Sequence, residues 1–311
     1  MYTELIAGPD DNGRRIDRIL RKALSDYPLS MIHRLLRQKK IKVNGKHVCK
    51  PEERIYQGDT LQIFSVTVDN PEKKQGNNSP IQLPEIIWQG SGIIIFNKPS
   101  GISTHGPNSL DTLVKKSFTG ESHSISFKPG PLHRLDKPTS GIIAFSQTLE
   151  GAILFSHLLH EKLITKKYLA IIEGEIKQKA IWQDDLVHNK SDKKTYIKTD
   201  LIETTDNAKE AFSVVKPYAW NGNYSLVEIQ IKTGRTHQIR AQASHHGHPL
   251  AGDLKYGSRI KGDFFLHAWQ MEFIEEYGKF PKIITAPLPD RFISQINSLF
   301  GKEIAGKITR L

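Results

Sequence analysis

The spacing of apolar residues near the N-terminus predicts two short helices. One helix face follows the i, i+3, i+4, i+7, i+8 pattern and consists of Ile16, Ile19, Leu20, Ala23 and Leu24. Pro28 interrupts this pattern, and Ser30 is a candidate N-cap for a second helix. The apolar residues that this second helix would bury are Ile32, Leu35 and Leu36.

A hairpin and then a polar stretch follow the predicted helices. Ile41 and Val43 alternate with polar residues and lead into Asn44-Gly45, a dipeptide preferred in tight hairpin turns. Residues 69–84 are polar, rich in Pro, Asn and Lys, and without an apolar period, which is typical of a flexible linker. We therefore expect an N-terminal module at residues 1–66, a linker at 67–84 and a second domain at 85–311.

The second domain is predicted to mix short strands with helices. Residues 142–146 and 168–172 have the pattern of buried strands, and residues 149–159 that of a helix. Val227, Ile229 and Ile231 alternate with polar residues, as in a half-buried strand, and Thr236 is a candidate N-cap for a helix running to about His245. Strands and helices do not alternate regularly. We therefore predict an α+β fold with a mixed, mainly antiparallel sheet, flanking helices and a small N-terminal αα-hairpin module.

Composition narrows the cellular setting. No apolar run approaches the roughly 20 residues needed to span a bilayer. The N-terminus has neither the basic start nor the apolar stretch of a signal peptide. The single cysteine, Cys49, excludes an internal disulfide and a multi-cysteine zinc site. We expect a cytoplasmic protein with no membrane partner, and we expect it to be a monomer.

Positive charge is concentrated in the N-terminal module. Residues 14–50 contain twelve Lys or Arg and two acidic residues, a net +10 in a chain whose formal charge is +11. This concentration favours binding to a polyanion such as RNA, because neutralising phosphates releases counterions. A basic helical cap that binds no ligand is the alternative.

Basic side chains at the second predicted helix and its exit form a candidate RNA-binding surface. They are Arg34, Arg37, Lys39, Lys40 and Lys42. Two short helices, a hairpin and this basic cluster resemble the RNA-binding module named after a small-subunit ribosomal protein, the S-four-like domain. The resemblance covers about residues 14–64.

The segment at residues 133–141, with the sequence HRLDKPTSG, carries the main candidate for catalysis. It is a polar loop that ends in glycine and enters a predicted buried strand, a place where a scaffold can hold a carboxylate at a cleft. The carboxylate here is Asp136. Taken alone, an aspartate in such a loop is more often a hydrogen-bonded turn residue.

This segment and two others, in the same order, resemble the motifs of RluA-type pseudouridine synthases. The second is KYLA at residues 167–170, similar to the family's tyrosine motif. The third is TGRTHQIR at residues 233–240, followed by HPLAGD at 248–253 and YG at 256–257, similar to its arginine motif. NKPSG at residues 97–101 is similar to a segment found early in such catalytic domains. The resemblance spans about residues 86–274.

The resemblance implies that the chain isomerises selected uridines in structured RNA to pseudouridine. Nothing is oxidised and no group is imported, so no metal or redox cofactor is expected. Asp136 would be the catalytic carboxylate and Arg240 its cationic partner. Tyr168 would lie against the uracil ring, restrain it during rotation and help to remove the proton from carbon 5. Because a stacked nucleotide must be extruded before it can react, Arg134 would occupy the vacated space.

The sequence leaves open which RNA is the substrate and does not by itself exclude two other functions. The layout is most similar to the branch that modifies large-subunit ribosomal RNA, and transfer RNA is an alternative substrate. A non-catalytic RNA-binding or ribosome-assembly protein is a second class, disfavoured by the intact set of Asp136, Tyr168 and Arg240. A metal-dependent hydrolase would use His237 with the histidines at 245, 246 and 248. Their spacing offers no convincing ligand set, so no metal site is expected.

Overall fold

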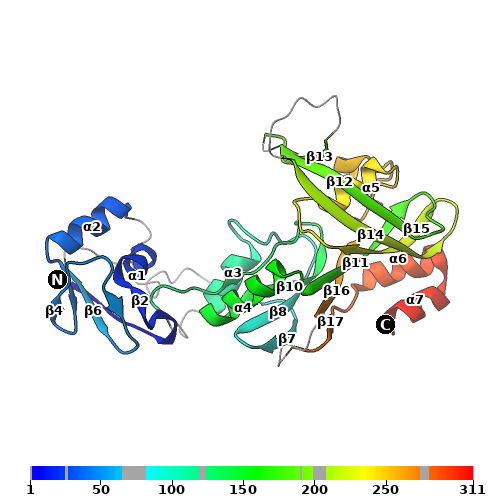
Figure 1. The fold of residues 1–311 in the computed structure, drawn as a ribbon. Coiled ribbons are helices and arrows are strands. Elements are labelled where there is room, and N and C mark those ends of the chain that lie inside the picture. The colour runs from blue at the N-terminus through cyan, green and yellow to red at the C-terminus, as the bar shows by residue number, and fades with distance from the viewer. Residues whose placement is uncertain are drawn as a thin grey trace.

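The computed structural model describes residues 2–24, 27–64, 82–118, 124–189, 191–198, 208–273 and 280–310 (Figure 1). Most of the predicted linker at 67–84 lies outside these residues. The elements before Phe64 and those from Ile86 onward pack around separate apolar cores. None of the described helices is both long and apolar enough to cross a membrane.

The N-terminal elements combine two helices with a four-stranded antiparallel sheet. The sheet order is β1 (Tyr2–Ile6), β6 (Thr60–Phe64), β3 (Ile41–Val43) and β4 (Lys46–His47). A second strand pair and a short 3-10 helix accompany it: β2 (Arg14–Arg15), β5 (Arg54–Ile55) and η1 (Pro9–Asp11). The helices are α1 (Ile16–Ala23) and α2 (Leu29–Arg37). Their predicted apolar faces are confirmed, since the buried residues include Ile16, Ile19, Leu20, Ile32, Leu35 and Leu36.

Of the predicted hairpin turn and the predicted N-cap in this region, the turn is confirmed and the N-cap is wrong. The hairpin turn at Asn44-Gly45 is confirmed, because both residues have positive φ angles, 49° and 79°, as the tight turn requires. The prediction of Ser30 as an N-cap is wrong. Pro28 is the N-cap, with φ −67° and ψ 152°, and α2 begins directly after it.

The remaining strands form one eleven-stranded sheet. Its order is β13 (Lys194–Ile197), β12 (Ala180–Asn189), β14 (Lys209–Trp220), β15 (Tyr224–Ile231), β11 (Ile164–Glu173), β16 (Leu266–Phe273), β10 (Ser140–Ser146), β8 (Ile93–Lys98) and β7 (Ile86–Gly90). In addition, β17 (Ile283–Thr285) pairs with β16, and β9 (Gly130–Pro131) with β10. Only the pairing of β10 with β16 is parallel among those described. The predicted mixed, mainly antiparallel α+β fold is confirmed.

Helices flank this sheet (Figure 1). They are α3 (Leu110–Ser117), α4 (Leu149–His160), α5 (Gln238–His245), η3 (Leu254–Tyr256), α6 (Asp290–Phe300) and α7 (Lys302–Thr309). Phe155 of α4 joins the apolar core of β8 and β10, whereas Phe292 of α6 packs in a cluster with Leu226 of β15.

The strand β15 is buried more completely than its sequence predicted. Glu228 lies on the same face as Leu226, is only 9% exposed, and accepts a hydrogen bond of 2.8 Å from the hydroxyl of Tyr218. The expectation of a half-buried strand is therefore wrong. The alternating residues do separate into two faces, but the cluster containing α6 covers the face that would otherwise meet solvent.

The parallel contact between β10 and β16 places the loop that carries Asp136. Gly141 pairs with Ala268 and has φ 105°. A Cβ atom at Gly141 would lie 2.2 Å from the carbonyl oxygen of Ala268, so a side chain cannot fit without moving the strands. Beside it, the hydroxyl of Ser140 hydrogen-bonds Nδ1 of His267 at 2.8 Å. The glycine at the end of HRLDKPTSG thus permits this close approach.

Asp11 connects the N-terminal elements to residues 124–126. Its carboxylate is fully buried and accepts hydrogen bonds from the hydroxyls of Ser124 (2.8 Å) and Ser126 (2.5 Å) and from the backbone N–H of Ile125 (2.6 Å). Burial alone would raise the pKa of Asp11, but these hydrogen bonds together bring it below its usual value.

We expect Asp11→Ala to lower the free energy of unfolding by about 2–4 kcal/mol at pH 7, because several buried donors lose their acceptor. The lowered pKa means that the charged carboxylate contributes its full stabilisation above the unfolded value of 3.8, and that this is lost as the pH falls through the folded value. Urea unfolding at pH 7 and below pH 3.8 measures both effects. The exposed Glu52→Ala is the control, and equal losses in the two variants at pH 7 would contradict the prediction.

Candidate active site

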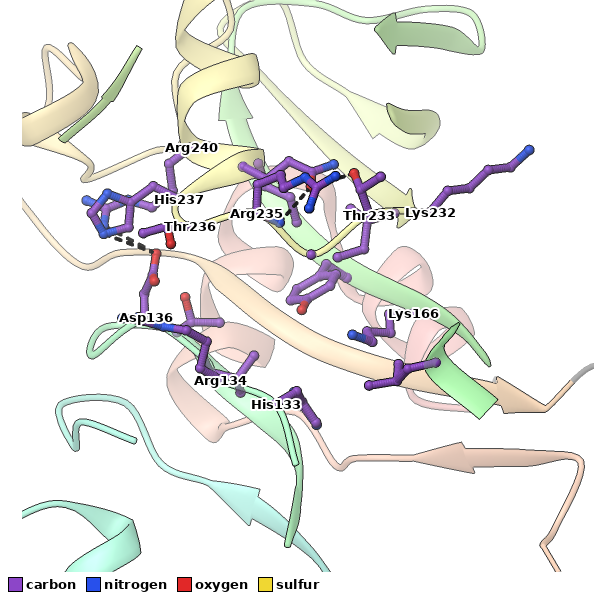
Figure 2. A pocket seen from close by; sticks show the side chains of 18 of the residues that line it. His133, Arg134, Asp136, Lys166, Lys232, Thr233, Arg235, Thr236, His237 and Arg240 are labelled. Atoms are coloured by element: carbon purple, nitrogen blue, oxygen red, sulfur yellow. Dashed lines mark hydrogen bonds and ion pairs between the residues drawn. The ribbon is translucent and has the colours of Figure 1, made fainter. Parts of the chain in front are cut away.

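A pocket of about 610 Å³ lies between the loop before β10, the strand β11 and the loop that enters α5 (Figure 2). Its lining includes Asp136, Tyr168 and Arg240, the three residues that the sequence predicted to act together. They come from segments far apart in the chain, and the sheet topology brings them into one pocket.

Asp136 carries the carboxylate at one end of this pocket. Its side chain is 15% exposed, so it is accessible while largely enclosed. Its Oδ2 lies 3.4 Å from Nη1 of Arg240 and 3.8 Å from Nε2 of His237. No hydrogen bond is made by Oδ1 within the part of the chain that the structure describes, so this oxygen remains available to a ligand.

Backbone contacts hold the loop that carries Asp136. The hydroxyl of Thr104 donates to the carbonyl of Leu135 at 2.9 Å and accepts from its N–H at 3.1 Å. The hydroxyl of Ser100 donates to the carbonyl of Pro138 at 2.7 Å. Because these contacts fall on both sides of Asp136, the position of the carboxylate is set by the segment that includes NKPSG.

Lys98 links the loop that carries Asp136 to residues 99–102. Its side chain is fully buried, and its Nζ donates to the carbonyls of Ile102 at 2.8 Å, Pro99 at 3.1 Å and Lys137 at 3.4 Å. Burial lowers the pKa of Lys98 to about 8, although the charge of Asp136 acts in the opposite direction. A buried ammonium with three carbonyl acceptors, one of them in the residue after Asp136, therefore lies near the carboxylate.

Arg240 is anchored before it meets Asp136. Its Nε and Nη2 each donate to Asp253 at 2.7 Å, a two-pronged pairing in which Asp253 is only 2% exposed. The guanidinium also lies 4.7 Å from the ring centre of Tyr256. Burial acts to lower the pKa of Arg240, but the hydrogen bonds and charge of Asp253 outweigh it and raise the pKa overall. Only Nη1 is left to face Asp136.

Tyr168 lies on β11 with its ring in the pocket lining and is 7% exposed. Its hydroxyl makes no hydrogen bond to any residue in the described ranges. Burial, and secondarily the charge of Asp136, raises the pKa of Tyr168. The side chain is therefore a neutral phenol at physiological pH.

The pocket is strongly cationic. Asp136 is the only carboxylate among its described lining residues, whereas the cations are Arg134, Lys162, Lys166, Lys232, Arg235 and Arg240. Burial lowers the pKa of Lys166 to about 8. Such a lining favours a negatively charged ligand. Arg134 is exposed at this pocket, two residues from Asp136 (Figure 2).

The predicted RNA-binding residues of the N-terminal elements do not line this pocket. Arg34, Arg37, Lys39 and Lys40 are exposed at the end of α2 and just beyond it, and Lys42 on β3 is half-buried. They are near one another in sequence and form a basic surface separate from Asp136.

The entry into α5 differs from its prediction. Thr236 is not the cap, because α5 begins at Gln238 and its N-cap is His237, which has a left-handed φ of 53°. The side-chain oxygen of Gln238 accepts hydrogen bonds from the hydroxyl of Thr233 at 2.8 Å and the N–H of Arg235 at 3.1 Å, and so closes this turn. His237 is thereby placed beside Asp136.

The other histidines of this region have separate partners. His246 approaches Asp184 at 3.2 Å and stacks on Trp182, while Nδ1 of His248 contacts the carbonyl of Glu173 at 3.0 Å. Within the described residues, no group of three or more His, Cys, Asp or Glu side chains could hold a metal ion.

Four residues near Asp136 were not assigned a role in the pseudouridine synthase site from the sequence, and His237 was considered only as a metal ligand. They are Lys98, His237, Asp253 and Tyr256. All four lie within the segments that carried the family resemblance, so their membership in those motifs was the available signal. Their individual contacts depend on the folded arrangement.

The matching family model is described as RNA pseudouridylate synthase and covers residues 92–245. The chain is 32% identical over 306 residues to the ribosomal large subunit pseudouridine synthase C of Buchnera aphidicola subsp. Schizaphis graminum, covering 92% of this chain and 94% of that protein. It is 33% identical to the protein of the same name from Escherichia coli strain K12, covering 80% and 78% respectively.

Solved structures with the same fold include two human proteins. Human RNA pseudouridylate synthase domain containing 4 matches with a TM-score of 0.57 at 20% identity, covering 68% of this chain and 91% of that chain. Human RNA pseudouridylate synthase domain containing 1 matches with a TM-score of 0.55 at 21% identity, covering 76% and 98%.

We expect Asp253→Asn to lower the free energy of unfolding by about 3–5 kcal/mol, because the buried Arg240 would lose its charged partner. The control is Asp263→Asn, whose exposed pair with Arg291 at 3.2 Å should cost less than about 1 kcal/mol. Chemical denaturation of both variants measures the difference. Equal, small losses would show that the Arg240–Asp253 pair does not support the fold.

Proposed function

The chain belongs to the RNA pseudouridylate synthase family, and from this premise we propose that it converts selected uridines of large-subunit ribosomal RNA to pseudouridine with Asp136 as the catalytic carboxylate. The predicted family resemblance is confirmed, and the chain is an RNA-modifying isomerase. The choice of ribosomal RNA is supported by the names of relatives that match nearly the whole chain.

One observation carries the catalytic assignment to Asp136. It is the single carboxylate among the described residues that line the pocket, where six Arg and Lys residues also lie, and its Oδ1 is free to meet a ligand. The volume of about 610 Å³ leaves room for an extruded nucleotide, and the cationic lining suits the phosphates beside it.

The proposed reaction is balanced without any imported group. The bond between N1 of uracil and C1′ of ribose breaks, the base turns, and a bond forms between C5 and C1′. The proton on C5 is lost and N1 gains one. Asp136 would act as nucleophile or as a proton relay in this sequence, which requires no cofactor.

Arg240 and Tyr168 have distinct proposed roles. Nη1 of Arg240, the donor not engaged by Asp253, would hold Asp136 in its orientation through the contact at 3.4 Å. Tyr168 would pack against the uracil ring and restrain it during rotation. Its raised pKa disfavours a phenolate, so we assign it a packing role rather than that of a charged base.

Arg134 is proposed to occupy the space in the base stack that the extruded target nucleotide leaves. It is exposed at the pocket and adjoins the buried Leu135, whose backbone is held on both sides by Thr104. An arginine that starts from a fixed backbone can insert beside the extruded base without reorganising the loop.

The N-terminal elements are proposed to be an S-four-like RNA-binding domain covering residues 1–66, followed by a linker at 67–84 and the catalytic domain at 85–311. The exposed cations at the end of α2 support this assignment. We further propose that the enzyme works in the cytoplasm as a monomer without a membrane partner, in keeping with its free, exposed Cys49.

We expect Asp136→Asn to reduce pseudouridine formation at least about 1,000-fold, equivalent to about 4 kcal/mol of transition-state stabilisation. Tritium release from RNA labelled at uracil carbon 5 measures the reaction, and Asp263→Asn is the matched control. Comparison of large-subunit ribosomal RNA with transfer RNA tests the substrate. Release by Asp136→Asn at the wild-type rate would refute the catalytic assignment, and release from transfer RNA alone would refute the substrate.

We expect Arg134→Ala to lower kcat/KM about 10- to 100-fold on structured RNA, because nucleotide extrusion costs a few kcal/mol. The loss should be smaller on a short unstructured RNA with the same target sequence, where less stacking must be broken. Unchanged turnover and affinity on both RNAs would exclude the proposed insertion.

We expect Arg34→Gln combined with Arg37→Gln to weaken RNA binding and to reduce the slope of log affinity against log salt by about 0.9 for each phosphate that is no longer neutralised. Single-turnover rates at saturating RNA should stay within about twofold, since neither residue lines the pocket. Lys302→Gln combined with Lys307→Gln on α7 removes the same charge elsewhere. Equal effects of the two pairs would contradict a specific N-terminal RNA surface.

A further inference from the structure

We propose that His237 is a positioning residue for Asp136, held as the neutral Nε2–H tautomer by a hydrogen-bond chain that starts at the backbone of Thr195 and passes through Tyr256. The inference rests on the proposed catalytic role of Asp136. It assigns the two oxygens of that carboxylate different tasks: Oδ2 faces donors from the protein, and Oδ1 faces the substrate.

The direction of the hydrogen bonds from Thr195 through Tyr256 to His237 follows from the first donor. The backbone N–H of Thr195 can only donate, and it does so to the hydroxyl oxygen of Tyr256 at 2.8 Å. That hydroxyl lies 2.8 Å from Nδ1 of His237. The side-chain oxygen of Thr195 also interacts with this hydroxyl, but it already accepts from His188, so we assign the hydroxyl proton of Tyr256 to Nδ1 of His237 at 2.8 Å. A buried donor left unpaired costs about 1–3 kcal/mol. The proton therefore points to Nδ1, which must be the unprotonated nitrogen.

Thr195, where this series of hydrogen bonds begins, is itself held in place. The hydroxyl of Thr195 donates to the carbonyl of Thr236 at 2.9 Å, which ties β13 to the loop that carries His237. The same oxygen then accepts from Nδ1 of His188 at 2.9 Å. The ring of His188 meets that of His237 edge to face, with their centres 6.1 Å apart. Residues of β12 and β13 thus lie against His237 and the loop that carries it.

The backbone of His237 has an uncommon conformation. Its φ of 53° is in the left-handed region, which an L residue with a Cβ atom adopts at a cost. Asn or Gly would relieve that cost. Histidine adopts this region more often than most residues, so the backbone can hold His237 here with its ring beside Asp136.

The charges around His237 favour its neutral form. Burial lowers its pKa, Asp136 acts to raise it, and Arg240, Lys255 and His188 each lower it further, so that the pKa falls below its ordinary value. Burial also raises the pKa of Tyr256, which keeps the hydroxyl proton that the chain needs. Lys194 lies 5.2 Å from the centre of the Tyr256 ring and adds positive charge on the same side.

The consequence for Asp136 is an asymmetric carboxylate. Oδ2 faces Nη1 of Arg240 at 3.4 Å and Nε2 of His237 at 3.8 Å. The second separation exceeds a hydrogen bond, so this N–H orients the carboxylate through its dipole. With both donors on Oδ2, the lone pairs of Oδ1 are directed into the pocket.

The first test is ¹⁵N NMR of the histidine side chains in the full-length protein at pH 7. His237 is identified by the signal that disappears in His237→Gln. We expect Nδ1 to be an unprotonated acceptor and Nε2 to carry the proton. Tyr256→Phe, which retains the ring over Arg240, should abolish this single-tautomer state. A proton on Nδ1 of His237 in the wild type, or an unchanged tautomer in Tyr256→Phe, would overturn the proposal.

The second test compares two amides in place of the imidazole. His237→Gln puts an N–H donor near the position of Nε2, whereas His237→Asn puts its amide near Nδ1. We expect kcat about tenfold higher for Gln than for Asn, with similar KM values. Backbone preference predicts the opposite order of stability, because Asn adopts left-handed φ more readily. Activities that follow stability would mean a purely structural role and would overturn the proposal.

The two tests separate this proposal from the proposed function. If the wild type forms no pseudouridine in ribosomal or transfer RNA, the function fails, and the NMR result still decides the tautomer. If the wild type is active and Asp136→Asn is not, but the Gln and Asn variants are equally active, then the function stands and the role of His237 is refuted.

Discussion

The arrangement of the pocket depends on one buried guanidinium. Arg240 gives two donors to Asp253 at 2.7 Å and its remaining Nη1 to Asp136 at 3.4 Å. The Asp253 pairing compensates much of the cost of burying the charge. Arg240 can therefore contact a second carboxylate with Nη1 while Nε and Nη2 stay paired with Asp253. Arg240 lies on α5 and Asp136 lies on the loop before β10. The side chain of Arg240 therefore connects the two sides of the pocket.

Burial of polar groups has a consistent pattern around this guanidinium. The fully buried ammonium of Lys98 donates to three backbone carbonyls, and those bonds connect the loop that carries Asp136 to residues 99–102. His133 has its pKa lowered to about 3 by burial, and its neutral Nε2 accepts from the N–H of Ala144 at 3.0 Å. The carboxylate is therefore held by groups that cannot easily move. Holding a reacting group in a fixed orientation can contribute about 7–11 kcal/mol toward lowering a reaction barrier.

Local features of the fold were predictable because neighbouring residues determine them. The turn at Asn44-Gly45 follows from two residues that tolerate positive φ, and the buried face of α1 follows from 3.6-residue periodicity. The predictions for Thr236 and for β15 were wrong for a different reason. A glutamine side chain two residues later closes the entry to α5, and Glu228 is buried because a helix from the end of the chain contributes to the cluster over its face.

The sequence by itself determined the family, the α+β class and the identity of the candidate groups Asp136, Tyr168 and Arg240, because motifs and periodicity are properties of contiguous residues. The tertiary structure decided which oxygen of Asp136 faces its partners and which side chains support it. Asp136 and Arg240 are 104 residues apart, and His237 receives its hydrogen bond from Tyr256, 19 residues further on. Such contacts depend on how distant strands align, and a linear pattern does not encode the distance or direction between two side chains.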